Sequence, residues 1–455
     1  MNYKFLTSIL LGATLTLASS CEEKLNVEPV AQLSPEVVGA EDAPKLLRGI
    51  YDALQNGNTS FYYLSYATED LSADNLRYRA TFFQHGEVND NTILTNNVLV
   101  SRYFNGPYVV IQRANDLLEI LNNNTSIPDN VKQPLLGQAY FLRAYGYYRL
   151  VTLFGGVPIV NDRDITKVPR NSQDEVYAQI ISDLEASLAN GAEFTNSKFA
   201  SIQAAKALLA RVYLIRGEWA LAKQYADEVI NSGEFALTSD YASMFTAPYE
   251  SSEHIFKLNY TATEAENSLD YFLQHPTMPG SGRAELPVDP SLVEAYEEGD
   301  ERKAASIVEI PAPTAASGFY TKKFQDPTGN GAVPMYILRI AEMYLISAEA
   351  QFQISGNTAD PVVLERINAV RTNRGLGALT SVDLYDIIQE RRVELAFEGT
   401  RWTDMKRTPS ETNPQKSLAT VFLEAKGRTA NDQLYPIPQS AIDRNELLLP
   451  NNPGY

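Results

Sequence analysis

Three glutamates near the carboxyl end of the chain have a spacing that acid–base chemistry could use. Glu390, Glu394 and Glu398 are four residues apart, which would place them on one face of a helix. Carboxyl pairs hydrolyse glycosidic bonds when one of them keeps its proton through a raised pKa. Three arginines stand beside these glutamates, namely Arg391, Arg392 and Arg401. The pattern therefore predicts an ion-paired helix end and no catalytic residue.

Other side chains that could catalyse a reaction or bind a metal are scattered. The three histidines, His85, His254 and His275, have no metal-ligand spacing with one another. The sequence has no glycine-rich phosphate loop and no G-x-S-x-G nucleophile turn. Residues 280–282, Gly-Ser-Gly, are typical of a flexible loop. We therefore expect no enzyme activity, no metal site and no cofactor.

The only cysteine, Cys21, stands where a bacterial lipoprotein is cleaved and acylated. Lys4 precedes a short apolar run over residues 5–17 and the small residues Ala18, Ser19 and Ser20. This order is that of a secretory signal, and the run is too short to cross a bilayer. The sequence predicts a signal peptide over residues 1–20 and lipidation at Cys21, with a mature domain over residues 21–455.

The composition excludes some classes of partner. The formal net charge is −18, and it becomes −19 once Lys4 is removed with the signal. Binding to nucleic acid needs basic patches, so this balance argues against a nucleic-acid partner and against electrostatic adhesion to anionic lipid. The hydrophobic fraction of 44% is ordinary for a packed globule. Without a second cysteine, stability must come from burial alone.

Most of the chain has the apolar periodicity of amphipathic helices. The predicted helices cover residues 109–121, 132–154, 174–188, 201–215, 218–231, 339–353, 361–372 and 385–398. Gly155, Gly156 and Pro158 end the second of them, and Gly217 joins the fourth to the fifth. Residues 205–230 are similar to a tetratricopeptide unit, in which small alanines let two helices approach closely. We expect degenerate helix pairs within about residues 109–400.

Two segments lack this periodicity. Residues 70–99 are polar and rich in Asn and Asp, and residues 258–328 are rich in Pro, Gly, Tyr and Phe. Long irregular segments within a compact fold are usually functional. We therefore expect the function of this helical protein to lie in these two segments.

The residues around 388–407, IQERRVELAFEGTRWTDMKR, closely resemble the signature of the SusD/RagB family of Bacteroidetes outer-membrane lipoproteins. Further matching segments follow in the expected order over residues 141–160, 206–214, 339–350, 367–376 and 434–455, ending in NPGY. The resemblance implies a single, mostly α-helical domain of tetratricopeptide-like helix pairs with long irregular ligand-binding loops. The acidic pair Glu22 and Glu23 also resembles the surface-export signal of such lipoproteins.

The resemblance also implies a role. Members of the family sit on the cell surface, lipid-anchored in the outer membrane, as a lid over a SusC-like TonB-dependent transporter. They bind glycans, or in some members peptides, and are not enzymes. Three hypotheses stay open: an oligosaccharide receptor for uptake, a peptide-binding RagB-like receptor, and a scaffold lid without its own ligand.

In the family, ligand contacts come from the loop after the first helix and from the irregular segment after the repeats, which are the two segments above. Aromatic faces hold sugars by their C–H surfaces, and polar side chains take the hydroxyl groups. The candidates are Arg77, Tyr78, Phe82, Phe83, His85, Tyr271, Phe272, His275 and Arg283. About half of the aromatic candidates are expected to be loop anchors.

The two tryptophans are both expected to be structural. Trp219 lies in the tetratricopeptide-like pair, and Trp402 is predicted to pack beneath the glutamate helix. Tyr and Phe must then supply any stacking surface, with less area each. This favours oligosaccharides, glycoconjugate glycans or peptides over long polysaccharides.

Overall fold

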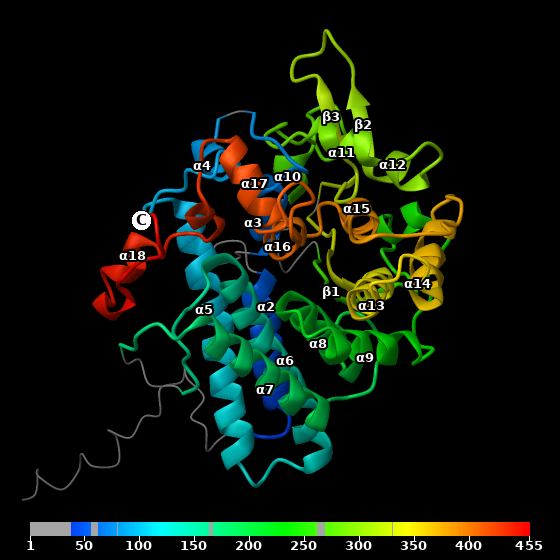
Figure 1. The fold of residues 1–455 in the computed structure, drawn as a ribbon. Helices are drawn as coiled ribbons and strands as arrows, with labels where there is room; N and C mark the ends of the chain where they lie inside the picture. The colour runs from blue at the N-terminus through cyan, green and yellow to red at the C-terminus, as the bar shows by residue number, and fades with distance from the viewer. Residues whose placement is uncertain (1–37, 56–61, 80, 163–166, 262–268, 330) are drawn as a thin grey trace, which may run out of the picture.

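The computed structural model describes residues 38–55, 62–79, 81–162, 167–261, 269–329 and 331–455. The expected signal peptide and Cys21 lie outside this range. The fold is mostly α-helical, as predicted, and few strands interrupt the helices (Figure 1). Within the described residues, no helix combines the length and the apolar character needed to span a bilayer.

Four long helices form one side of the molecule: α2 (Ala43–Gln55), α5 (Val98–Asn123), α6 (Asp129–Phe154) and α7 (Gln173–Asn190). The α5 helix begins eleven residues before the predicted start at residue 109, because Asn97 caps it by accepting from the amides of Leu99 and Val100. Ser172 and Glu175 cap α7 with a reciprocal capping box. A Cβ on Gly137 would lie 2.4 Å from Gly191 Cα, so glycine permits the close contact of α6 with the end of α7.

The predicted tetratricopeptide-like pair is present as α8 (Ile202–Arg216) and α9 (Trp219–Ile230). Gly217 ends α8 in the left-handed conformation at φ 72°, which glycine adopts without strain. The rings of Tyr213 and Tyr225 stack between the two helices at 5.7 Å. A second pair, α13 (Ile340–Ser355) and α14 (Pro361–Thr372), packs against α9 through α13.

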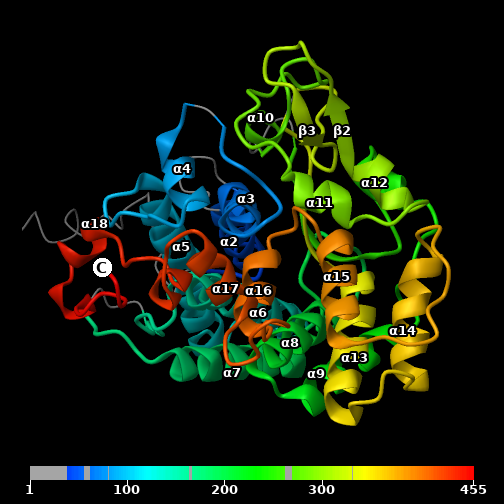
Figure 2. The ribbon, with the colours of Figure 1, turned by 45° about the horizontal axis from the view of Figure 1, so that its top comes forward.

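Two small antiparallel sheets were not predicted. Strand β1 (His254–Leu258) pairs with β4 (Met335–Arg339), and every residue of both is buried. Strands β2 (Ile307–Ile310) and β3 (Gly318–Thr321) form a hairpin that projects from one end of the molecule (Figures 1 and 2). These strands are too short to show a period that differs from their surroundings.

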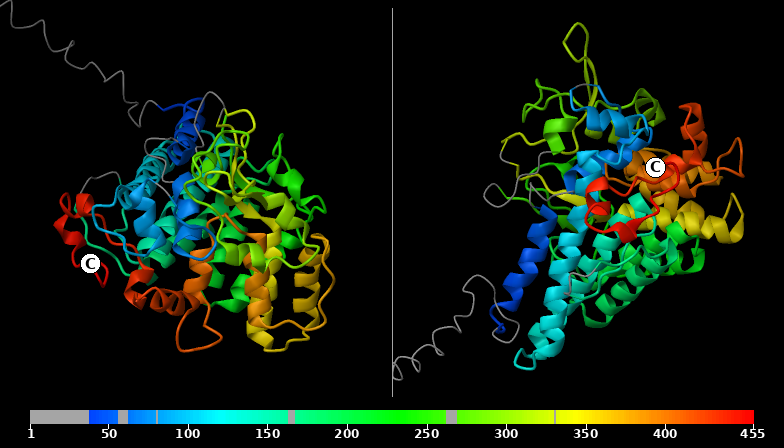
Figure 3. Two further views of the ribbon diagram at one scale, coloured as in Figure 1. Left: turned by 90° about the horizontal axis from the view of Figure 1, so that it is seen from above. Right: turned by 90° about the vertical axis from the view of Figure 1, so that its left-hand side faces the viewer.

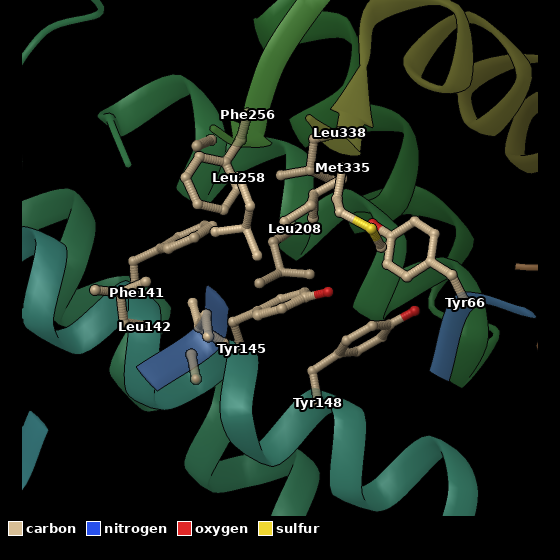
Figure 4. Packing of buried hydrophobic residues seen from close by; sticks show 14 of the residues in the cluster. Tyr66, Phe141, Leu142, Tyr145, Tyr148, Leu208, Phe256, Leu258, Met335 and Leu338 are labelled. Atoms are coloured by element: carbon tan, nitrogen blue, oxygen red, sulfur yellow. The ribbon is translucent and has the colours of Figure 1, made fainter. Parts of the chain in front are cut away.

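The central core lies where α3 (Tyr62–Ser72), α6, α8 and the β1–β4 sheet meet. Figure 4 shows Tyr145 of α6 against Leu208 of α8 and Tyr148 of α6 facing Tyr66 of α3, while Phe141 of α6 lies against Phe256 of β1. Their burial is the main stabilising contribution in a chain without disulfides.

The predicted helix over residues 385–398 is shorter than expected. Helix α15 (Leu384–Glu394) ends four residues early, and α16 (Arg401–Arg407) begins after a turn. Phe397 and Gly399 have positive φ in this turn, and their amides donate to the buried carboxylate of Asp70. Glu398 therefore does not share a helical face with Glu390 and Glu394, because the backbone turns to satisfy Asp70.

The two segments predicted to be irregular contain short helices. Residues 70–99 include α4 (Phe83–Asn89), and residues 258–328 include α10 (Leu269–Leu273), α11 (Pro290–Ala295) and α12 (Glu301–Ser306). The remaining short elements are η2 (Tyr241–Phe245), α17 (Leu418–Ala425), η3 (Ala430–Gln433), α18 (Gln439–Ile442) and η4 (Glu446–Leu448). With the β2–β3 hairpin, helices α10, α11 and α12 break up the second segment, and Figure 3 shows the described parts of both segments at the same end of the long helices.

Candidate functional site

The two segments predicted to hold the ligand site come together. Residues 76–79 run antiparallel to residues 285–288, with an isolated bridge between Leu76 and Val288. The amide of Arg77 donates to the carbonyl of Pro287 at 2.8 Å, and that of Arg79 to the carbonyl of Glu285 at 3.0 Å. This pairing fixes the loop before α4 against the loop after α10.

Four rings from these segments form what we call the aromatic platform: Phe82, His85, Tyr271 and Phe272. Their centroids are 5.1 Å apart for Phe82–His85, 5.2 Å for His85–Phe272 and 5.4 Å for Tyr271–Phe272. All three contacts are edge-to-face, the geometry that aromatic quadrupoles favour. Tyr271 is 46% exposed, so its ring is available to a ligand.

Arg283 adds a cation to this platform. Its guanidinium carbon lies 5.6 Å from the centroid of the Tyr271 ring and 6.0 Å from that of Phe272, within the range of a cation–π contact. The same group donates through Nη2 to the hydroxyl of Thr81. Its Nε lies 3.1 Å from Oε2 of Glu285. The guanidinium is thus held beside the exposed tyrosine by contacts from both segments.

One ring of the platform, His85, forms a buried pair with Glu285. Nδ1 of His85 lies 3.7 Å from Oε1 of Glu285, and both side chains are buried. Burial lowers the pKa of His85, because the charged imidazolium loses its hydration. Burial alone would raise the pKa of Glu285, but His85, the amide of Phe82 and Arg283 together hold it below its ordinary value. Glu285 is therefore a carboxylate at neutral pH that orients its neighbours.

The platform does not include the remaining candidates of the first segment, which are Arg77, Tyr78 and Phe83. The ring of Tyr78 covers Gly86, where an added Cβ would lie 2.9 Å from the ring. The Nε of Arg77 lies 2.5 Å from Oδ2 of Asp289. Phe83 is 63% exposed at the start of α4. These three side chains come from the same loop segment as Phe82 and His85 of the platform.

His275 is not part of this group. Its ring nitrogens lie 2.8 Å from the hydroxyl of Thr277 and 2.9 Å from the carbonyl of Ala315, and the ring packs against Tyr320. The side chain is buried, and it ties the loop after α10 to the β2–β3 hairpin. We assign it a structural role.

The site also includes residues that the sequence did not single out. Thr81 and Glu285 hold Arg283, and Arg79 stands two residues from Arg77. Glu285 had one usable signal, since it is a carboxylate inside an otherwise apolar stretch over residues 284–288. No pattern in the sequence marks Thr81, because only the tertiary pairing of the loops brings it to Arg283.

The glutamates near the carboxyl end are ion-paired, as predicted. Glu394 accepts from Arg302, Arg339 and Arg374, all of which are buried. Burial alone would raise the pKa of Glu394. The charges of Arg374 and Arg339 instead hold this pKa well below its ordinary value. A carboxyl group acting as an acid catalyst needs the opposite shift.

The partners differ from those expected, however. Arg391 pairs with Asp404 at 3.1 Å, whereas Arg401 and Arg392 pair with Asp74 at 2.7 and 3.4 Å. The arginines that neutralise the glutamates come instead from distant segments. Trp402 is fully buried, but in a small cluster with Ala73, Met405, Ala419 and Leu423, none of which belongs to the glutamate helix α15, beneath which the sequence predicts it to pack. Across the described part of the chain, no group of three or more His, Cys, Asp or Glu side chains could hold a metal ion.

Comparisons with known proteins agree with this architecture. A family model described as "SusD family" matches residues 304–455, and one described as "Starch-binding associating with outer membrane" matches residues 25–214. The chain is similar to SusD-like protein P2 of Formosa agariphila, with 27% identity covering 99% of each chain. It is also similar to a SusD-like protein of Bacteroides ovatus, with 26% identity over 69% of this chain and 66% of the relative.

Solved structures share the fold. A laminarin-binding SusD-like protein superimposes with a TM-score of 0.79 at 24% identity, covering 91% of this chain and 99% of that one. Surface glycan-binding protein A of Bacteroides thetaiotaomicron, solved with laminarihexaose, gives 0.76 at 19% identity, covering 91% and 100%. With both family models and the fold in agreement, this chain belongs to the SusD/RagB family.

Proposed function

We propose that this protein is a cell-surface lipoprotein that binds oligosaccharides and delivers them to a SusC-like TonB-dependent outer-membrane transporter. The observation that carries the proposal is the aromatic platform, whose exposed Tyr271 has the Arg283 guanidinium beside it. Support also comes from relatives whose names record binding of laminarin and laminarihexaose.

The platform offers the two kinds of contact that a sugar needs. The ring of Tyr271 can pack against the C–H face of a pyranose, and Arg283 can donate hydrogen bonds to its oxygens. Phe272 contacts Tyr271 edge-to-face and is itself held edge-to-face by His85, and both are more buried than Tyr271. A site held in place in this way loses little conformational entropy on binding.

The anchor and the location belong to the same proposal. We assign acylation to Cys21 after removal of residues 1–20, which would tether the mature domain to the outer membrane. Two or more acyl chains bind a membrane far more stably than one. The protein acts by binding and not by catalysis, and its partners are the glycan and the transporter.

The first test is ligand binding by the soluble form that begins at Glu22. Thermal shifts against oligosaccharides and mixed oligopeptides separate the hypotheses, since a ligand at 100 times its Kd stabilises the fold by about 2.7 kcal/mol. Tyr271→Ala should weaken sugar binding by roughly tenfold or more. A response to peptides alone would favour a RagB-like receptor, and no response to either class would favour a scaffold lid.

Tyr344→Ala is a suitable control for that variant. Tyr344 also has an arginine over its ring, with the Arg366 guanidinium carbon 5.7 Å from the centroid. It lies on α13, away from the platform (Figure 2). Sugar binding should therefore be unchanged in this variant.

A further inference from the structure

A cavity that shares no residue with the aromatic platform lies where several helices end. Its volume is about 410 Å³. Its walls come from the last turns of α6 and α8, the first turns of α7, helix α16 and the segment around η3. Pockets that hold small molecules in proteins have volumes of this order. The cavity is therefore a candidate site separate from the proposed glycan site.

One charged side chain in this cavity lacks a partner of opposite charge. Lys406 of α16 is only partly exposed, and its ammonium group donates to the backbone carbonyl of Thr152, which also lines the cavity. No carboxylate of the described residues forms an ion pair with it. An ammonium group has three N–H donors, so two of them are left for a ligand or for solvent. A shielded charge without a countercharge is costly, and an anion at this place would relieve that cost.

The other charges around Lys406 cancel one another. Arg407, which also lines the cavity, belongs to a cluster in which three arginines meet three carboxylates: Arg211, Arg391, Arg407, Glu342, Glu349 and Asp404. Arg149 of α6 pairs with Glu69 of α3 at 2.8 Å. Lys406 thus adds one positive charge to surroundings that are otherwise balanced.

The cavity wall supplies no carboxylate among the described residues. Three carboxylates adjoin lining residues in the sequence, namely Asp174, Glu175 and Asp432. Each of them has contacts elsewhere, with Arg216, Ser172 and Thr429 respectively. The charge of Lys406 is therefore not balanced from within the cavity.

The groups that face Lys406 from neighbouring helices set its protonation. Burial lowers the pKa of Lys406 to about 8, with Glu69 opposing this shift and Arg149 adding to it. Tyr177 of the cavity wall stays neutral in this range, because burial raises the pKa of its hydroxyl group above the ordinary value. Lys406 is thus mostly charged at pH 7 and mostly neutral above pH 9.

The rest of the wall is largely apolar. The lining side chains without a charge or an amide include Val151, Ile215, Leu434 and Pro453, and the ring of Tyr177 stands among them. A ligand that fills this space therefore needs an apolar part as well as a group for Lys406.

We propose that this cavity binds an organic molecule with a single carboxylate, which accepts hydrogen bonds from Lys406 while its apolar part packs against the wall. One carboxylate matches the one positive charge that is not balanced. A sulfate or phosphate dianion would bring more negative charge than Lys406 can balance and would leave the apolar wall without a contact. This second site goes beyond glycan binding and does not depend on it.

The test compares acids with their uncharged amides, by isothermal titration calorimetry on the soluble form that begins at Glu22. The test ligands are benzoate with benzamide, and 4-phenylbutyrate with 4-phenylbutyramide. At pH 7 at least one acid should bind about tenfold or more tightly than its amide, as expected when a charge-assisted hydrogen bond replaces a neutral one. The affinity for the acid should fall between pH 7 and pH 9, as Lys406 loses its proton, and the affinity for the amide should stay constant.

Two variants address the charge and the space separately. Lys406→Met keeps an apolar side chain and should remove both the preference for the acid and its pH dependence. Ala430→Phe adds a ring at an exposed wall residue and should weaken binding of acid and amide alike. Lys426→Met is the matched control, since Lys426 also donates to a backbone carbonyl, that of Asn89, but does not line the cavity. Urea unfolding checks that each variant is folded.

Three results would overturn the inference. Equal binding of acid and amide would reject the carboxylate, and a preference for the acid that persists in Lys406→Met would place the anion elsewhere. Binding of neither acid at millimolar concentration would show that the cavity holds solvent only. None of these results bears on sugar binding by the platform.

Discussion

In the candidate site, Glu285 contacts both a buried ring, His85, and a partly exposed guanidinium, that of Arg283. It lies 3.7 Å from His85 and 3.1 Å from Arg283 and accepts the amide of Phe82 at 2.9 Å. Glu285→Gln keeps the shape of the side chain and removes its charge. We expect weaker ligand binding because Arg283 is less well held, and a loss of roughly 1–3 kcal/mol of stability.

Urea unfolding and ligand titration measure these two effects separately. Glu298→Gln, a change at an exposed carboxylate on another loop, is the control and should alter neither. Unchanged ligand affinity in Glu285→Gln would show that Arg283 is positioned without it.

Gly86 gives a second test at the residue scale. Alanine in the middle of α4 would gain up to about 1 kcal/mol of helix propensity, but its Cβ would meet the ring of Tyr78 at 2.9 Å. We expect Gly86→Ala to displace Tyr78 and weaken ligand binding with little change in the melting temperature. A crystal structure of the variant, or its affinity for the ligand, would check this result.

At the scale of secondary-structure elements, the turn between α15 and α16 gives a prediction about stability. Gly399 has φ 68°, and an added Cβ would lie 3.3 Å from Cα of Tyr66. Gly399→Ala should therefore cost roughly 1–3 kcal/mol of unfolding free energy, from backbone strain and close contact. Gly377→Ala is the control, because a Cβ there meets nothing within 4 Å. Equal urea midpoints for the two variants would contradict the expectation.

At this scale the sequence predicts long helices well and short elements poorly. Helix α14 has the predicted bounds, and α6 ends where Gly155 indicates, because propensity and capping act locally. The end of α15 is set by Asp70, which lies more than 300 residues away in the chain. No local pattern could have revealed that contact, nor the burial of β1 and β4.

The candidate site could be predicted only in part, for the same reason. The aromatic and basic residues were visible because the two loops stand out from the helical pattern, and family resemblance directed attention to them. Which of them meet depends on loop pairing, and this separates His275 from the platform. Whether these residues bind a ligand remains a prediction.

For the whole molecule, buried ion pairs predict how stability depends on pH. Burial alone would raise the pKa of both Asp74 and Asp404. The arginines paired with them instead hold the pKa of each carboxyl group at about 2. Both values are below those of an unfolded chain, so the stabilisation is complete above about pH 4 and is lost as the pH falls toward 2. Urea midpoints measured from pH 5 to pH 2 should fall steeply over that window.

Asp404→Asn should flatten this dependence as well as lower stability at pH 7. It removes a partner of Arg391 and Arg407, which would then be buried without sufficient countercharge. A pH profile parallel to that of the wild type would contradict the assignment.

The charge network around Glu394 also constrains how the chain reaches its native state. Arg339 donates to Glu253, Glu394 and Glu398, so one side chain joins segments that are far apart in sequence. During synthesis, Glu253 and Arg339 are made well before residue 394, and neither can be buried at low cost until the later carboxylates arrive. Folding of this protein is therefore expected to be late and all-or-none, and a nascent chain shorter than about 400 residues should remain sensitive to proteases.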